Sequence, residues 1–264
     1  MGADTWAGLA DEFADGAYAS VKGRVRTYVV HRQLLNHLPE APARVLDVGG
    51  GAGHQSLPLA EVGYEVTLLD ASEAMLDKAR YRLEHLPERV QQRATLLHAA
   101  GENAEEVLQG RLFDAVLCHG VLGYQDAPGP LVDQLCRCVR PGGVVSIVTG
   151  NAAAMAVRPA LEQRWEDALA AFDTTCETGV LGVATRADTL DELDALMRKR
   201  GVHPLDWYGV WLFTDWFDLS GAALDPDDAE QLQAAAEVEL EAGKRDPYRQ
   251  LSRLIHLLGR KSED

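Results

Sequence analysis

Residues 44–53 read RVLDVGGGAG, and residues 64–70 read YEVTLLD. The first stretch joins a short β-type run to four glycines, and a helical pattern begins near His54. A strand that enters a tight glycine turn lets the backbone approach a bound nucleoside closely, because no Cβ stands in the way. Asp70 ends the second run, where a carboxylate can accept hydrogen bonds from both hydroxyls of a ribose. Together the two stretches predict a nucleoside pocket.

The spacing within the glycine loop distinguishes between cofactors. A dinucleotide-binding loop has the pattern G-x-G-x-x-G, whereas this loop reads D-x-G-x-G-x-G from Asp47 to Gly53. An acid at position 47 does not suit a cofactor with phosphates, but it suits a positive sulfonium and a free α-amino group. The pattern resembles the first motif of the S-adenosylmethionine-dependent methyltransferases with a Rossmann-like sheet. The alternative, a strand–turn–helix corner without a ligand, is disfavoured by the strand, helix and acid around the loop.

Strands alternate with helices along the first 150 residues. Seven runs are expected to form strands, and they are residues 44–48, 64–70, 94–99, 112–120, 144–150, 203–213 and 251–260. Their near-continuous apolar character implies a parallel sheet that is buried on both faces. We therefore expect an α/β fold with a Rossmann-like, seven-stranded, mostly parallel sheet and helices on both faces. The resemblance adds an antiparallel last strand and helical cap insertions.

The length of 264 residues supports one large domain. We expect a single methyltransferase domain over residues 1–264 with four parts: a helical lid at 1–40, the cofactor-binding core at 41–150, a substrate cap at 151–187, and the C-terminal part of the sheet at 188–264, which includes an acidic helical insertion at 217–243. No run reaches the roughly 18–20 apolar residues of a membrane span. Four cysteines form neither a CxxC pair nor a metal-ligand set, so we expect a cytoplasmic protein without a metal.

The net charge of −16 opposes non-specific attraction to nucleic acid. Basic residues nevertheless form two clusters, Lys22, Arg24 and Arg26 near the start and Lys244, Arg245, Arg249, Arg253, Arg260 and Lys261 at the end. Each cluster is too short to predict a nucleic-acid patch alone. If the two converge in space, they could form one.

Several polar residues follow the predicted strands and are candidates for the site. His119 ends the fourth strand, where it could contact the cofactor, act as a general base, or be a histidine bonded only to backbone. Gly101 and Glu102 follow the third strand, where this family contacts the adenine; an acid at a helix N-terminus is the alternative for Glu102. Arg26 could hold the methionine carboxylate through two hydrogen bonds, or lie on a solvated helix face.

Tyr248 and Arg249 follow Pro247 near the start of the last strand. They could supply a hydroxyl and a guanidinium to an anionic substrate, or be residues of a surface turn. The expected methyl transfer is an in-line displacement that requires mainly the positioning of two partners. A carboxylate acceptor is already ionised at pH 7, whereas a phenol or alcohol usually requires a base.

The order of motifs also resembles one branch of the family, the bacterial tRNA 5-carboxymethoxyuridine methyltransferases. The resemblance rests on residues 13–34, 44–80, CHGVL at 118–122, VRPGG at 139–143 with Asn151, and 246–261. It implies methyl esterification of a modified wobble uridine in tRNA. It also implies that the cofactor contacts are Arg26, Gly49, Gly50, Asp70, Gly101, Glu102 and His119, to which the first motif adds Asp47 and Gly51.

Two alternatives remain open at this point. One is a methyltransferase that acts on a hydroxyl or carboxyl group of a small molecule. The other is a non-catalytic subunit that binds S-adenosylmethionine for a partner enzyme. The sequence leaves the methyl acceptor and the oligomeric state open.

Overall fold

The computed structural model describes residues 8, 10, 16–178, 182–217 and 224–263. The parts of the predicted lid, cap and acidic insertion that fall at 1–7, 9, 11–15, 179–181 and 218–223 lie outside the described residues. Within those that are described, nine strands form the centre of the molecule. They are β1 (Arg44–Val48), β2 (Glu65–Asp70), β3 (Ala94–His98), β4 (Phe113–His119), β5 (Val139–Asn151), β6 (Cys176–Thr178), β7 (Ala184–Asp188), β8 (Val202–Val210) and β9 (Leu254–Lys261).

The order of the strands places a binding crevice in the middle of the sheet. Strands β3, β2, β1, β4 and β5 are parallel neighbours in that order. Strand β9 then pairs antiparallel with β5, and β8 pairs antiparallel with β9. The chain moves outward from β1 to β3 and then returns to β4, and ligands of open α/β sheets bind at such a reversal. The expected α/β fold, with its mostly parallel sheet and antiparallel last strand, is confirmed.

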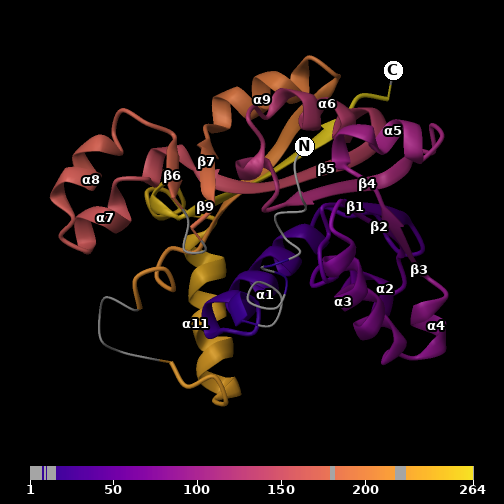
Figure 1. Cartoon of the computed structure of the whole chain (residues 1–264), viewed down its shortest axis with the longest axis horizontal. Helices are drawn as coiled ribbons and strands as arrows, with labels where there is room; N and C mark the ends of the chain where they lie inside the picture. The colour runs from indigo at the N-terminus through magenta and orange to yellow at the C-terminus, as the bar shows by residue number, and fades with distance from the viewer. Residues whose placement is uncertain (1–7, 9, 11–15, 179–181, 218–223, 264) are drawn as a thin grey trace.

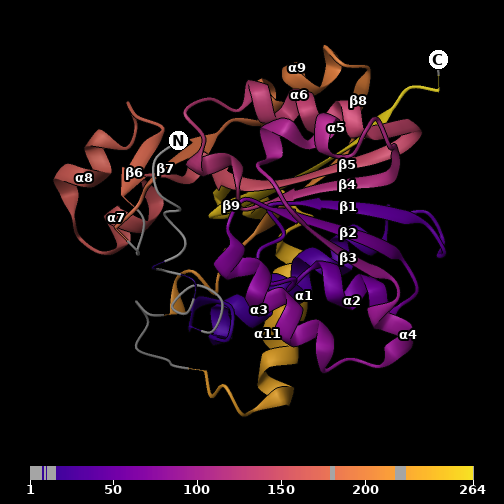
Figure 2. The ribbon, with the colours of Figure 1, turned by 45° about the vertical axis from the view of Figure 1, so that its right-hand side comes forward.

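Helices cover both faces of the sheet, as Figures 1 and 2 show. One face carries α5 (Ala104–Val107), α6 (Gly129–Cys138) and α9 (Leu190–Arg198). The other carries α1 (Val21–Leu35), α2 (Ser56–Glu61), α3 (Glu73–Glu84), α4 (Glu88–Gln91) and α11 (Ala229–Ala242). These two layers explain why the central strands are apolar along nearly their whole length.

Helix α1 is anchored by its apolar side. Val25, Val29 and Val30 are buried in one cluster with Leu232 and Ala236 of α11. Three valines of this kind contribute several kcal/mol when buried, at roughly 1.5–3 kcal/mol each. This packing fixes the position of α1 beside the carboxyl ends of the central strands. Within the predicted acidic insertion at 217–243, helix α11 occupies residues 229–242.

The segment 151–187 differs from its expected helical character. It contains α7 (Val157–Leu161) and α8 (Trp165–Ala170), but also β6 and most of β7. Strand β7 extends the sheet by pairing with Gly150 and Asn151 at the end of β5. The predicted count of seven strands is therefore too low by the two strands of this hairpin. All seven expected strands are present. Among its described residues the hairpin is buried only at Ala187 and Asp188, and it lacks the apolar run by which the other strands were found.

The bounds of three strands differ clearly from the expected ones. Strand β5 begins at Val139 rather than at 144. Strand β8 ends at Val210 rather than at 213, because Trp211 has a φ of 62° and turns the chain. Strand β9 begins at Leu254, since Tyr248–Leu251 form a short 3-10 helix, η5. No helix among the described residues is both long and apolar enough to cross a membrane.

Candidate active site

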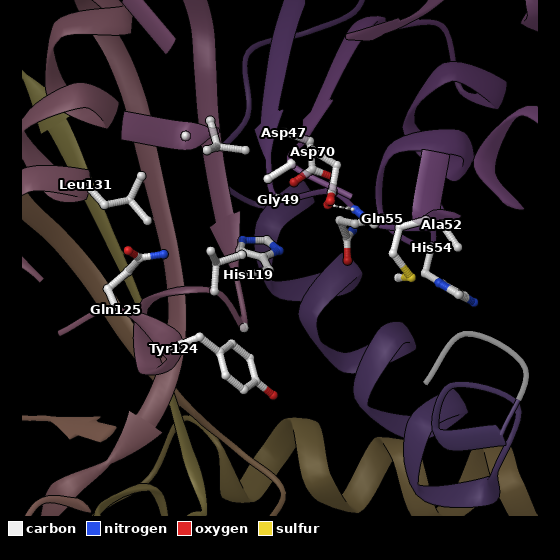
Figure 3. A pocket seen from close by; sticks show the side chains of 18 of the residues that line it. Asp47, Gly49, Ala52, His54, Gln55, Asp70, His119, Tyr124, Gln125 and Leu131 are labelled. Carbon is white, nitrogen blue, oxygen red and sulfur yellow. Dashed lines mark hydrogen bonds between the residues drawn. The ribbon is translucent and has the colours of Figure 1, made fainter. Parts of the chain in front are cut away.

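A cavity of about 660 Å³ opens at the carboxyl ends of β1, β2 and β4. The glycine loop after β1 forms one wall, and residues that follow β3 and β4 form another. Helix α1 and the start of β7 complete it. Figure 3 shows Asp47, Asp70, His119 and Tyr124 around this cavity. The cavity lies where the strand order reverses, as the topology requires.

The glycine loop has a backbone that other residues would not adopt without strain. Gly49 and Gly51 have φ values of 70° and 54°, in the region that favours glycine. At Gly50, a Cβ would lie 2.6 Å from Cγ of Leu68 and 2.9 Å from Oδ2 of Asp47. A side chain at position 50 would therefore displace the carboxylate of Asp47. Because glycine has no side chain, the backbone itself forms this wall of the cavity.

Asp70 is oriented by two backbone amides. The N–H of Gly51 donates to its Oδ2 at 2.8 Å, and the N–H of Ser72 donates to its Oδ1 at 2.9 Å. Both bonds hold the carboxylate at the wall of the cavity, where either oxygen can accept a further hydrogen bond from a ligand. This arrangement can accept the two hydroxyls of a ribose.

Asp47 is a buried acid beside the cavity, and among the described residues the hydroxyl of Ser56 donates a hydrogen bond to its Oδ2. Burial raises the pKa of Asp47 to about 6, and the negative charge of Asp70 adds to the increase. The Ser56 hydrogen bond and the charge of Arg26 act in the opposite direction. A cationic ligand in the cavity would therefore stabilise the ionised form of Asp47.

Arg26 is a buried cation that faces the cavity from α1. Its side chain donates to the hydroxyl of Tyr18 at 3.2 Å and lies near the rings of Tyr18 and Trp211. Among the described residues, no carboxylate lies within ion-pair distance of it. A buried arginine without an anionic partner is a receptor for a carboxylate.

His119 contributes an unsatisfied atom to the same wall. Its Nδ1 is the buried side-chain nitrogen that lacks a hydrogen-bond partner within the described part of the chain. Burial lowers the pKa of His119 well below 6.5, and His256 and Arg26 lower it further. The imidazole is therefore neutral at pH 7. An unpaired buried nitrogen at a cavity wall indicates a contact with a bound molecule.

The structure brings together all nine residues predicted to contact the cofactor. Arg26, Asp47, Gly49, Gly50, Gly51, Asp70, Gly101, Glu102 and His119 all line the cavity. Tyr248 and Arg249 do not line it. Tyr248 is exposed, whereas Arg249 pairs with Asp246 and stacks on Trp207. The geometry of the cavity gives no support to the predicted substrate contacts of these two residues.

Sequence reasoning missed several cavity residues. Tyr18 lines the cavity and stacks on His54 with ring centroids 4.1 Å apart. Tyr124 and Gln125 enter from the segment after β4, and Val183 and Ala184 enter from the cap. Tyr18 lies eight residues before Arg26 in a segment that was expected to cover the site, which was the available signal. The cap residues had none, because the hairpin that carries them was not predicted.

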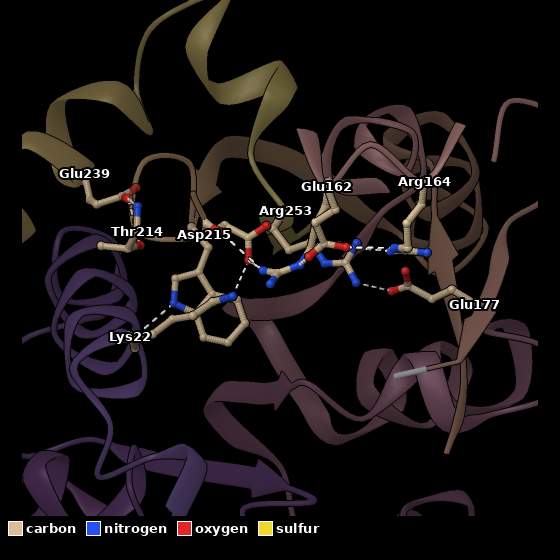
Figure 4. A network of polar contacts seen from close by, with 10 residues as sticks. Lys22, Glu162, Arg164, Glu177, Thr214, Asp215, Glu239 and Arg253 are labelled. Carbon is tan, nitrogen blue, oxygen red and sulfur yellow. Dashed lines mark hydrogen bonds and ion pairs between the residues drawn. The ribbon is translucent and has the colours of Figure 1, made fainter. Parts of the chain in front are cut away.

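The basic clusters do not converge around the cavity. Figure 4 shows Lys22 paired with Asp215 and Arg253 paired with Glu177. Arg24 donates to the carbonyl oxygen of Pro226, and Arg245 pairs with Glu241. Within the described part of the chain, Arg26 is the lysine or arginine that lines the cavity. Apart from Arg26, these basic side chains therefore have partners within the protein and do not face the cavity.

The site fits S-adenosylmethionine on the chemistry of its donors and acceptors. Its amino-acid end carries a carboxylate and an ammonium group, and the cavity offers the guanidinium of Arg26, which pairs with no carboxylate of the described residues, together with acceptors at His119 and Asp47. The oriented carboxylate of Asp70 suits the ribose. At Gly101, a Cβ would lie 2.7 Å from Val48 and 2.8 Å from Leu131, so this wall also stays open only with glycine.

Comparisons with known proteins agree with this chemistry. A family model described as "Methyltransferase domain" matches residues 23–202, which is more than half of the chain. The tRNA 5-carboxymethoxyuridine methyltransferase of Escherichia coli (strain K12) is 26% identical over 258 residues, which cover 97% of this chain and 95% of that protein. The ubiquinone biosynthesis O-methyltransferase of Ruegeria sp. (strain TM1040) is 31% identical over 182 residues, with 67% of each chain covered.

A solved structure shows the same fold. The S-adenosylmethionine-dependent methyltransferase of Thermotoga maritima, a possible histamine N-methyltransferase, has a TM-score of 0.59 and 16% identity. The match covers 97% of this chain and 98% of that one. The comparisons favour an enzyme over a non-catalytic binding subunit. The chain belongs to the methyltransferase domain family and is an S-adenosylmethionine-dependent methyltransferase.

Proposed function

We propose that this enzyme methylates a carboxylate and that its acceptor is 5-carboxymethoxyuridine in tRNA. The observation that carries the proposal is the match to the E. coli tRNA enzyme over 97% of this chain and 95% of that protein. The match includes the cap and the C-terminal strands, where methyltransferases with different acceptors have room to differ. A tRNA acceptor also fits the expected cytoplasmic location.

The chemistry of the cavity supports an acceptor that needs no deprotonation. S-adenosylmethionine supplies an electrophilic methyl group on a sulfonium. One carboxylate oxygen forms the new bond to the methyl carbon as the bond to sulfur breaks, and the electron pair of that bond stays on sulfur. Because burial lowers the pKa of His119 well below 6.5, this residue would be a weak general base. A carboxylate acceptor does not require one.

The predicted contacts give each residue a role. Arg26 would bind the carboxylate of the cofactor, and Asp70 would accept hydrogen bonds from its ribose hydroxyls. Asp47 and the backbone of Gly49, Gly50 and Gly51 would lie along the methionine part. Gly101 and Glu102 would lie along the adenine. Positioning of this kind can account for several kcal/mol of an in-line transfer barrier.

The flanking segments would close the site. Residues 1–40 would form a lid, because α1 supplies Arg26 and Thr27 to the cavity. Residues 151–187 would form a substrate cap over the core at 41–150, because Val183 and Ala184 line the same cavity. The C-terminal part at 188–264 would hold α1 through α11 and complete the sheet.

A small-molecule acceptor is the second candidate function. It is favoured by the net charge of −16 and by the ion pairs that Lys22, Arg245 and Arg253 form with acidic side chains of the protein. Such an enzyme would methylate a hydroxyl or carboxyl group, and the Ruegeria relative is an O-methyltransferase. A phenol or alcohol would require a general base, and His119 would be a weak one because burial lowers its pKa.

A transfer assay distinguishes the two candidates. The protein is incubated with methyl-labelled S-adenosylmethionine and tRNA that carries 5-carboxymethoxyuridine, and with tRNA that lacks this nucleoside as the control. We expect label only in the modified tRNA, in a form released by mild base as a methyl ester is. Label that enters a small-metabolite extract but neither tRNA would overturn the tRNA assignment.

A further inference from the structure

A row of buried polar side chains lies behind His119, on the face of the sheet that α1 covers. Nε2 of His119 is 2.8 Å from Oγ of Ser146, which is also 2.8 Å from Nε2 of His256. Nδ1 of His256 is 2.8 Å from Oε1 of Gln33. Gln33 ends the row, since its Nε2 donates to the carbonyl oxygen of Gly209 at 3.2 Å. The row therefore connects α1, β9, β5 and β4.

The direction of these hydrogen bonds follows from the carbonyl at the far end. The oxygen of Gly209 can only accept, so Gln33 presents its amide N–H₂ there and its amide oxygen to His256. His256 must then carry its proton on Nδ1, which leaves Nε2 as an acceptor. The hydroxyl of Ser146 donates to that nitrogen, and its oxygen accepts from the Nε2–H of His119.

Both histidines are in the charge state that this direction requires. Burial lowers the pKa of His256 to about 3, and the charges of His37 and Arg26 lower it further. Burial likewise lowers the pKa of His119. A protonated His256 would leave Ser146 with no acceptor on that side. With both rings neutral, every polar atom of the row is satisfied except Nδ1 of His119.

We propose that Gln33, His256 and Ser146 are positioning residues that hold His119 as its Nε2–H tautomer, with the Nδ1 lone pair presented to the cavity. His119 would thus accept a hydrogen bond from an N–H or O–H group of the bound cofactor, of which its ammonium group is the candidate. The proposal rests on the cofactor site described above, but it does not depend on the identity of the methyl acceptor.

The tautomer can be measured directly in the wild-type chain. Long-range ¹H–¹⁵N correlation spectra of histidine-labelled protein at pH 7 distinguish a protonated from an unprotonated ring nitrogen, and a His119→Gln variant assigns the signals of this residue. We expect Nε2 of His119 to be protonated and Nδ1 to be bare. A His119 that carries its proton on Nδ1, or on both nitrogens, would overturn the proposal without the use of any other variant.

Two variants test the role of the row itself. Ser146→Ala removes the link between the two histidines, and Gln33→Met removes the acceptor that sets the direction. Each should give His119 a mixture of tautomers and weaken the binding of S-adenosylhomocysteine by about three- to tenfold, the effect of one lost hydrogen bond. Thr67→Val alters a buried hydroxyl of β2 outside the row and serves as the matched control.

A purely structural role for the row would show itself differently. The variants would then lower the melting temperature while the tautomer of His119 and the affinity for S-adenosylhomocysteine stayed as in the wild type. That result would overturn the positioning role. Because the readouts are a tautomer and the affinity for the product, a failure to methylate tRNA would leave them unchanged and would be recognised as a failure of the proposed acceptor.

Discussion

The substitution Asp47→Asn should make the cofactor-free protein more stable while it weakens cofactor binding. The amide has nearly the shape of the carboxylate and can still accept the hydrogen bond from Ser56. The substitution removes a buried charge that has no cationic partner within hydrogen-bond distance among the described residues. A buried acid that destabilises the cofactor-free protein has a purpose if the cofactor brings a cation that pairs with it.

The magnitude follows from the pKa of Asp47. Burial raises it from 3.8 to about 6, and this difference corresponds to about 3 kcal/mol. The folded state binds more protons than the unfolded state between these two pKa values, so the contribution of Asp47 to stability falls as the pH rises through this window. At pH 7 the loss is nearly complete. Asp47→Asn should therefore raise the melting temperature by up to about 6–10 °C.

Thermal unfolding of the cofactor-free protein at pH 7 and at pH 4 checks this prediction. The gain in melting temperature should shrink at pH 4, where Asp47 is protonated in the folded wild type. Asp114→Asn is the matched control: although burial alone would raise the pKa of Asp114, the Arg44 N–H and the Arg140 guanidinium together lower it. That variant should lose stability at pH 7. A lower melting temperature for Asp47→Asn at pH 7, or a gain that does not depend on pH, would refute the reasoning.

Three further variants test the walls of the cavity. Asp70→Ala should weaken S-adenosylhomocysteine binding at least about tenfold in calorimetry, because the ribose hydroxyls lose charge-assisted hydrogen bonds; an unchanged affinity would remove Asp70 from the site. Arg26→Met should weaken it by about ten- to hundredfold, yet leave the affinity for 5′-methylthioadenosine, which has no carboxylate, as it is; an equal loss for both ligands would indicate a general distortion. Gly50→Ala should lower the free energy of unfolding in urea by about 1–3 kcal/mol through the clash with Leu68. Gly16→Ala is the control and should lower it little, because a Cβ there meets nothing within 4 Å; equal losses would contradict the close packing of the loop.

Features with a local cause could be predicted from the sequence. The glycine loop needs positive φ values at Gly49 and Gly51, and only glycine adopts them easily, so the turn was visible in the residues themselves. Asp70 could be located because it ends an apolar run. Arg26 and His119 were candidates from their own positions, the family resemblance then assigned both to the cofactor, and the fold places both at the cavity.

Features that depend on distant contacts could not be predicted. The hairpin of β6 and β7 is stabilised where β7 pairs with the end of β5 and where the Thr149 hydroxyl donates to Asp188 at 2.7 Å, and neither contact leaves an apolar pattern in the sequence. Gln33 and His256 are 223 positions apart in the chain. Their hydrogen bond depends on how α1 packs on the sheet, for which the sequence has no periodic signal.

We infer that this cavity recognises the amino-acid end of S-adenosylmethionine through Arg26, Asp47 and His119. Calorimetric titration of the wild-type protein with S-adenosylhomocysteine and with 5′-methylthioadenosine tests it most directly, because the two ligands share the nucleoside and differ in the amino-acid end. Two charge-assisted hydrogen bonds at about 1.5–3 kcal/mol each predict that S-adenosylhomocysteine binds at least about a hundredfold more tightly. Equal affinities for the two ligands would show that the cavity does not recognise the amino-acid end.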